Sequence, residues 1–157
     1  MARLKKRVRR TRSGQYAIAL PDVERAVLRD LLDELRVLVA LAPDDPRVRR
    51  LYPTAYPDDP ARDEEFSRFM HNELRDSRSA AIETVATTLD AGTIDGDQLN
   101  AWMQALNSLR LVLGTALDVS EEDDPLAIDP ADPNARSQVL YGYLGYLLEE
   151  IVQAAEI

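Results

Sequence analysis

Apolar residues recur at helical spacing in four long segments of this chain, and this periodicity constrains the fold more than any other feature. The clearest segment opens at Pro21-Asp22 and ends before Pro43. Its apolar positions are Val23, Val27, Leu28, Leu31, Leu32, Leu35, Leu38 and Val39. Charged residues such as Glu24 and Asp33 fill the opposite side, so one face is expected to pack on a core.

Three further segments carry the same signal. Residues 61–90 are helical in pattern, with a break expected near His71–Asp76. Asp95 followed three residues later by Gln98 resembles a capping box and predicts a helix that continues to Leu117. The last helix is expected over 134–155, in a central position because apolar residues surround most of it.

Two glycines in this last helix, Gly142 and Gly145, each cost about 1 kcal/mol against Ala. Close approach of a neighbouring helix at these points explains them better than a flexible site does.

Two proline-containing connections separate the helices. Residues 43–60 hold five prolines, which cannot continue a helix interior, and Arg47–Tyr52 is expected to form one short helical turn. Tyr52 and Tyr56, each preceding a proline, are expected to pin this connection to the core. The second connection, 119–133, is acidic and is expected to be a solvated loop.

The first twenty residues predict a β-hairpin. Ser13-Gly14 is a turn signal, and residues 15–20 alternate between larger and smaller side chains. The predicted fold class is therefore mostly α, a bundle of about five helices preceded by an N-terminal β-hairpin. We expect one domain, with a basic hairpin over 1–20 and an acidic helical bundle over 21–157.

Charge is divided sharply along the chain, whose formal net charge is -9. Seven of the nineteen basic residues lie in the first twelve positions, and all twenty-eight acidic residues follow them. These seven are the candidate partner or nucleic-acid contacts: Arg3, Lys5, Lys6, Arg7, Arg9, Arg10 and Arg12. Three interpretations stay open, namely docking on a protein, which includes a second copy of the chain, neutralising phosphates, and protecting an edge strand from aggregation.

Composition argues against most enzymes. The chain has no cysteine, which removes disulfides, thiolate catalysis and zinc sites that need sulfur. His71 is the single histidine and is expected at a helix end or on the surface. No G-x-S-x-G motif and no glycine-rich phosphate loop is present. We therefore expect no catalytic residues, no metal and no cofactor.

No apolar run approaches the roughly 20 residues of a membrane-spanning helix, and no apolar stretch follows the basic start. A cytoplasmic location without membrane association is expected.

Several segments together resemble one known family. They are the hairpin Arg9–Gly14, the helix start Leu20–Glu24, the connection Arg50–Pro60, the segment Asn72–Arg75 and the segment Tyr141–Gly145. The chain resembles an actinobacterial family of unknown function whose genes commonly lie beside that of the ClpS adaptor. Some members are described as oxidative-stress or transcriptional regulators that work with the transcription machinery through a thiol switch. Without cysteine, this chain does not sense oxidants through its own thiols.

The resemblance and the divided charge together predict a non-enzymatic cytoplasmic regulator. It is expected to be transcription-associated and to act through contacts with a protein partner. Two alternatives stay open: a nucleic-acid binder that uses the basic strand, and a homodimeric interaction module.

Overall fold

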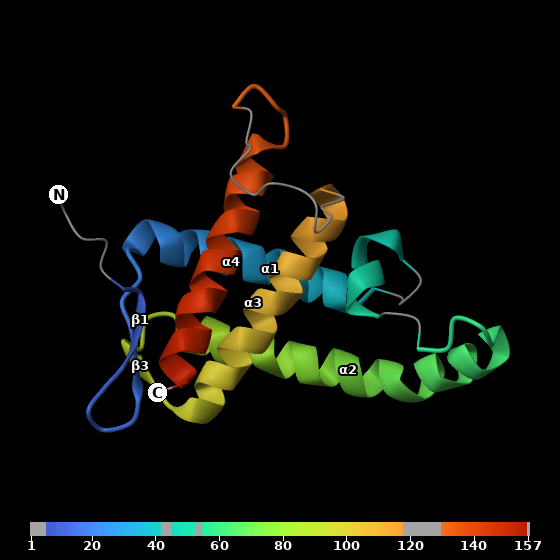
Figure 1. Ribbon diagram of the computed structural model, residues 1–157, viewed down its shortest axis with the longest axis horizontal. Helices are drawn as coiled ribbons and strands as arrows, with labels where there is room; N and C mark the ends of the chain where they lie inside the picture. Colours follow the sequence, from blue (N-terminus) through green and yellow to red (C-terminus); the bar gives the residue numbers. More distant parts are fainter. Residues whose placement is uncertain (1–5, 42–44, 53–54, 118–129, 157) are drawn as a thin grey trace.

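The computed structural model describes residues 6–41, 45–52, 55–117 and 130–156, which form a helical bundle with a small sheet at one end (Figure 1). The strands are β1 (Val8–Arg10), β2 (Tyr16–Ile18) and β3 (Thr93–Ile94). The helices are α1 (Asp22–Val39), the 3-10 helix η1 (Pro46–Leu51), α2 (Pro60–Thr88), α3 (Gly96–Leu117) and α4 (Ala135–Ala155). The mostly α fold class with an N-terminal hairpin is confirmed.

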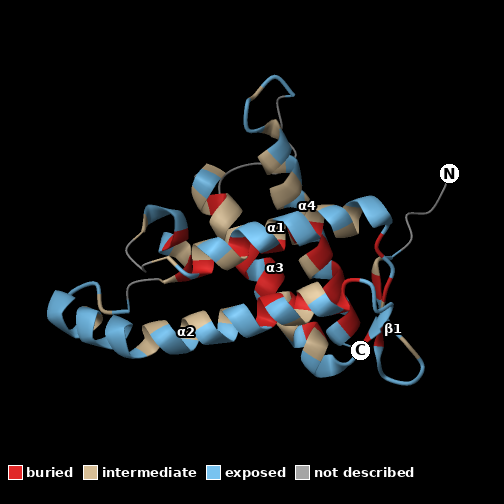
Figure 2. Ribbon diagram, turned by 180° about the vertical axis from the view of Figure 1, so that it is seen from behind, coloured by how far each residue is buried: buried red, intermediate tan, exposed pale blue. Residues whose placement is uncertain are grey.

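Helix α3 lies at the centre of the bundle. It contacts α1, α2, α4 and η1, and its Trp102 and Leu106 are completely buried. The prediction that the last helix is central was wrong. Helix α4 buries one face through Leu144, Leu147 and Ile151 but leaves other apolar side chains in solvent (Figure 2). Its wide apolar circumference therefore does not reflect burial on all sides.

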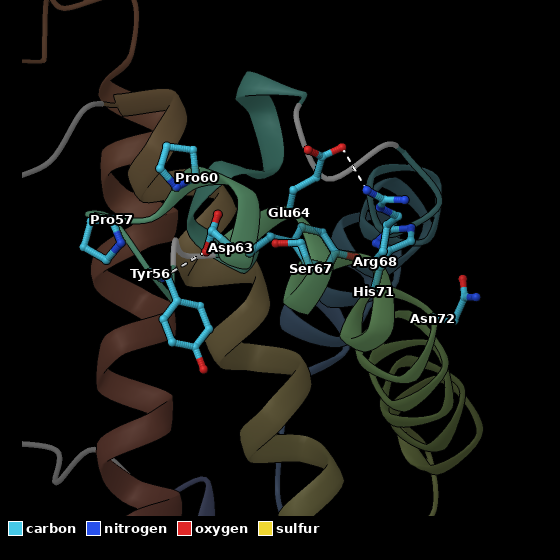
Figure 3. Close-up of a pocket in the computed structure, with 10 residues that line it drawn as sticks. Tyr56, Pro57, Pro60, Asp63, Glu64, Ser67, Arg68, His71 and Asn72 are labelled. Atoms are coloured by element: carbon cyan, nitrogen blue, oxygen red, sulfur yellow. Dashed lines mark hydrogen bonds and ion pairs between the residues drawn. The ribbon is translucent and has the colours of Figure 1, made fainter.

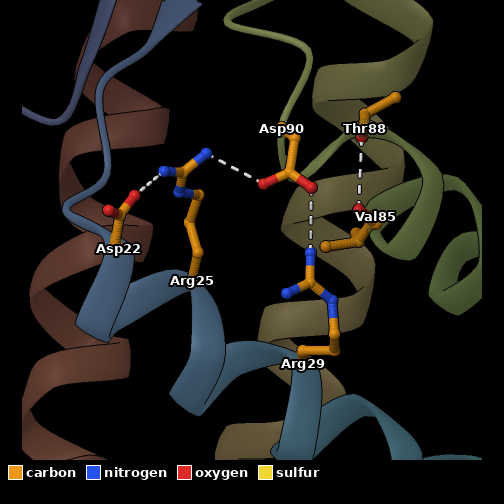
Figure 4. Close-up of polar contacts among 6 residues, drawn as sticks. All are labelled: Asp22, Arg25, Arg29, Val85, Thr88 and Asp90. Carbon is orange, nitrogen blue, oxygen red and sulfur yellow. Dashed lines mark hydrogen bonds and ion pairs between the residues drawn. The ribbon is translucent and has the colours of Figure 1, made fainter.

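Helix α1 has the predicted bounds and orientation. Its apolar face enters the core through Leu28, Leu32, Leu35 and Val39. On the solvent side, Arg25 and Arg29 both reach Asp90, at 2.8 and 3.0 Å, just beyond the end of α2 (Figure 4). These exposed pairs each contribute little free energy, but they link α1 to the turn that leads to β3.

Helix α2 is continuous over 29 residues, about 44 Å, so the break expected near His71–Asp76 was wrong. That segment contains neither proline nor glycine, so nothing in it forces a kink. The second half packs on the core through Ala81, Ile82 and Val85. The first half projects from the bundle, and Phe66 and Phe69 on it are exposed (Figures 1 and 2).

The hairpin is completed by a strand that the sequence did not reveal. β1 pairs antiparallel with β2, and β2 pairs antiparallel with β3, which lies more than seventy residues later in the chain. Gly14 turns the hairpin with φ 81°, a conformation that glycine adopts without strain. Gly92, with φ 78°, presents its carbonyl to the Ile18 N–H at 2.8 Å. At only two residues, β3 is too short to show an alternating pattern.

Local capping follows the sequence closely. The capping box is confirmed, because the Gln98 N–H donates to Asp95 and the Asp95 N–H donates to the Gln98 side chain, at 2.8 and 2.9 Å. The short helical turn is confirmed as η1, which begins after the capping residue Asp45. Among the described helices, none combines the length and the apolar character that a membrane span requires.

The two glycines of α4 have different surroundings. A Cβ at Gly145 would lie 3.4 Å from Nε of Arg110 on α3, an ordinary van der Waals contact with a side chain, so the helix packing does not require glycine at this position. A Cβ at Gly142 would meet nothing within 4 Å, so packing inside the chain does not explain that one. Most of the acidic connection, residues 119–129, lies outside the described residues.

Candidate functional site

The basic hairpin stands at one end of the bundle beside α4 (Figure 1). Of the seven predicted contact residues, Arg3 and Lys5 lie outside the described residues, and Lys6, Arg9, Arg10 and Arg12 are exposed. Arg7 alone is partly buried. Four of the five described basic side chains are therefore accessible to solvent near the hairpin, and Arg7 is set apart from them by its burial.

Arg7 anchors the hairpin to two helices. Its Nε donates to Glu24 Oε1 on α1 at 2.6 Å, and its backbone N–H donates to Glu150 Oε1 on α4 at 2.8 Å. Its guanidinium carbon lies 6.0 Å from the ring centroids of Tyr143 and Tyr146. Charge patterning alone did not distinguish this anchoring arginine from its neighbours.

The electrostatics of this junction agree with an anchoring role. The hydrogen bond from Arg7 to Glu24 raises the pKa of the guanidinium above its ordinary value. Burial raises the pKa of the Tyr143 hydroxyl, and the nearby Glu24 carboxylate raises it further. Both groups are thus held in their protonated forms, with Arg7 as a cation and Tyr143 neutral.

The pairing register orients the sheet. Val8 lies opposite Ile18, and both are buried against the bundle. Arg9 lies opposite Ala17, whose other partner is the exposed Thr93 of β3. Because side chains alternate along a strand, Arg9 belongs to the opposite face of the sheet from Val8. The outer face of the sheet therefore combines one arginine with small side chains and is open to a partner.

A second site is a cleft of about 720 Å³ between the first half of α2 and the connection that precedes it (Figure 3). Its aromatic and proline wall comes from Tyr52, Tyr56, Pro57 and Pro60. The residues that α2 supplies are Asp63, Glu64, Ser67, Arg68, His71 and Asn72. The sequence did not predict the cleft, although the connection that forms its wall is one of the segments that carry the family resemblance.

The two tyrosines of the cleft have different roles. Tyr52 packs against the core and lies 5.3 Å from the His71 ring, centroid to centroid, as expected for a residue that pins the connection. Tyr56 instead packs edge-on against Phe66 at 5.8 Å and lies under the Arg62 guanidinium. Its predicted contact with the core was wrong, because α2 projects beyond the core at this point and offers Phe66 instead.

His71 occupies the middle of α2, half-buried, and not a helix end. Ser67 lies one turn before it, but among the described residues no hydrogen bond joins the two side chains. The Asp63 carboxylate accepts the backbone N–H groups of Ala55 and Tyr56 at 2.8 and 3.0 Å, and Glu64 pairs with Arg68 at 3.2 Å. The carboxylates therefore hold the loop and a neighbouring arginine, and they do not orient the histidine for catalysis.

The described part of the chain brings together no cluster of three or more histidine or acidic side chains that could hold a metal ion. Two features stand out on the described surface: an anchored basic hairpin and an aromatic cleft on a projecting helix.

Fold and surface together define a small helical protein with a basic β-hairpin fixed to its side. The chain belongs to the family described as domain of unknown function DUF2017, whose model matches residues 5–155. It is 30% identical over 146 residues to a Mycobacterium leprae (strain TN) protein named "Putative oxidative stress regulator AosR", an alignment that covers 78% of this chain and 67% of that protein. No solved structure gives a significant match.

Proposed function

We propose that this protein is a non-enzymatic regulator that acts by binding another protein through the exposed side of its basic hairpin. One observation carries the proposal. Arg7 fixes the hairpin to α1 and α4, while Lys6, Arg9, Arg10 and Arg12 remain exposed on it. A fixed cationic surface loses little conformational entropy on binding and attracts acidic partners over a long range.

The similarity to a protein named as an oxidative stress regulator supports a regulatory role. The partner that we propose is a component of the transcription machinery, bound in the cytoplasm. Because the chain has no cysteine, the signal reaches it through the partner or through another molecule.

The test is affinity capture from lysate of the source organism, with the partner identified by mass spectrometry. The variant Arg9→Ser, Arg10→Ser, Arg12→Ser is expected to lose a transcription component that the unaltered protein retains. The matched control replaces three exposed arginines that lie away from both the hairpin and the cleft, Arg29, Arg47 and Arg49, and is expected to retain it. Arg7 is left intact because its side chain bonds to Glu24 of α1 and so belongs to the anchor of the hairpin. Equal capture by the two triple variants would refute the proposal.

The exposed cations also support a second function, binding of nucleic acid through phosphate contacts. Anisotropy of a labelled DNA duplex would then show an affinity that falls at least about tenfold between ~50 and ~200 mM salt. The same triple variant removes this binding. An affinity that does not change with salt contradicts phosphate recognition.

A further inference from the structure

Helix α4 carries an outward face that the described part of the chain approaches only at Tyr146, whose ring centroid lies 6.0 Å from the Arg7 guanidinium carbon. Val139 and Tyr146 are 56% and 48% exposed, and they lie two turns apart on one side of the helix. Gly142 lies between them, exposed, in the middle of a regular helix. The face thus consists of two large apolar side chains separated by a position without a side chain.

The glycine has no role inside the chain that the structure reveals. A Cβ at Gly142 would meet no atom within 4 Å, and its φ is not in the left-handed region. Glycine is a poor helix former, so alanine would make α4 more stable. A small residue at an exposed helix position does, however, let a second helix approach closely.

The charges beside this face are self-complementary. Arg136 lies one turn before Val139, and Glu149 lies one turn after Tyr146. Within the described residues neither side chain forms an ion pair, and Glu149 accepts only a hydrogen bond from Gln153 at 3.2 Å. The face therefore offers a cation at one end and an anion at the other, on either side of a central glycine.

We propose that this face binds a second copy of the chain, with the two α4 helices antiparallel about a twofold axis near Gly142. In this arrangement Val139 of each copy lies opposite Tyr146 of the other. Arg136 of each copy likewise lies opposite Glu149 of the other, so that opposite charges meet at both ends of the interface. A twofold interface requires a surface that complements itself, and this face meets that requirement. The proposal does not depend on what the hairpin binds.

Sedimentation equilibrium of the full chain tests the proposal. The mass is expected to rise with concentration from that of the 17.6 kDa chain toward twice that value. Val139→Asp is expected to raise the dissociation constant at least about tenfold, because a buried carboxylate at the interface lacks a partner. Val37→Asp on α1 is the matched control, since Val37 is also exposed, by 66%, and lies on another helix.

Four further variants distinguish this geometry from non-specific association. Gly142→Ala is expected to raise the melting temperature of the monomer while weakening the dimer, a combination that loss of folding cannot produce. Arg136→Glu and Glu149→Arg are each expected to weaken the dimer, and the double variant is expected to restore it. A wild-type chain that stays monomeric at several hundred micromolar would overturn the proposal. So would a dimer that Val37→Asp weakens as much as Val139→Asp.

Discussion

Single residues decide how this chain satisfies its buried polar groups. Trp102 is completely buried in α3, and its indole N–H donates to Thr88 Oγ1 on α2 at 2.8 Å. Thr88 in turn donates to the Thr84 carbonyl at 2.6 Å and lies 3.4 Å from that of Val85 (Figure 4). The Thr88 hydroxyl therefore both accepts and donates a hydrogen bond in the core, where water cannot replace either partner.

Replacing Thr88→Val keeps the shape of the side chain and removes the acceptor. We expect the free energy of unfolding to fall by about 1–3 kcal/mol, because the Trp102 N–H is left buried without a partner. Urea denaturation followed by tryptophan fluorescence measures this change, since Trp102 is the single tryptophan. Thr88→Ser retains the hydroxyl and should keep most of the hydrogen-bond contribution. Equal losses in the two variants would contradict this account.

At the scale of elements, α2 divides into a buried half and a projecting half. The sequence pattern predicted a helix over 61–90 but did not indicate which part of it reaches the core. Ile82 is 1% exposed and Phe69 is 73% exposed, although both are large and apolar. The difference arises because α1 and α3 pack against the later turns of α2, a tertiary contact that periodicity does not contain.

We therefore expect opposite outcomes at these two positions. Ile82→Ala should lower the free energy of unfolding by about 2–5 kcal/mol, because it leaves a cavity in the core. Phe69→Ala should change it by no more than about 0.5 kcal/mol, because the ring contacts mainly water. Chemical denaturation of both variants gives the comparison. A large loss at Phe69 would mean that the projecting half packs against something in solution.

The distinction between local sequence signals and tertiary contacts explains which parts of the fold and site were predictable. Local signals foretold the hairpin turn at Gly14, the capping box at Asp95 and the bounds of α1 within a few residues. The strand β3 and the cleft depend on segments that meet only after folding. The basic hairpin was visible as a charge cluster, but Arg7 differs from Arg9 only through Glu24 and Glu150, which are remote in sequence.

At the scale of the whole molecule, the junction of Arg7, Glu24 and Tyr143 joins the hairpin, α1 and α4. Burial raises the pKa of Tyr143 in the folded protein above that of an ordinary tyrosine. The folded state then holds this proton more tightly than the unfolded state, whose tyrosine titrates near ~10. By linkage, this contribution to stability is present below about pH 10 and is lost as the pH rises above it.

The free energy of unfolding of the unaltered protein is expected to fall between pH ~9 and ~11. The fall is expected to be smaller in Tyr143→Phe, because phenylalanine has no hydroxyl proton to lose. Denaturation curves at several pH values for both proteins provide the measurement. Lysine and the other tyrosines contribute equally to both curves, so the difference between them isolates Tyr143. Identical slopes would show that the hydroxyl is more solvated than the structure indicates.

The hydrogen bond between Arg7 and Glu150 joins residues 143 positions apart, and it bears on the order of events during folding. A hairpin of residues 8–18 can form as soon as it is made, because its contacts are local. Its contact with Glu24 of α1 is available early, but its attachment to β3 and α4 must wait until those elements have been synthesised, since they lie much later in the chain. On the ribosome, the basic hairpin is therefore held through α1 alone until β3 and α4 have been made.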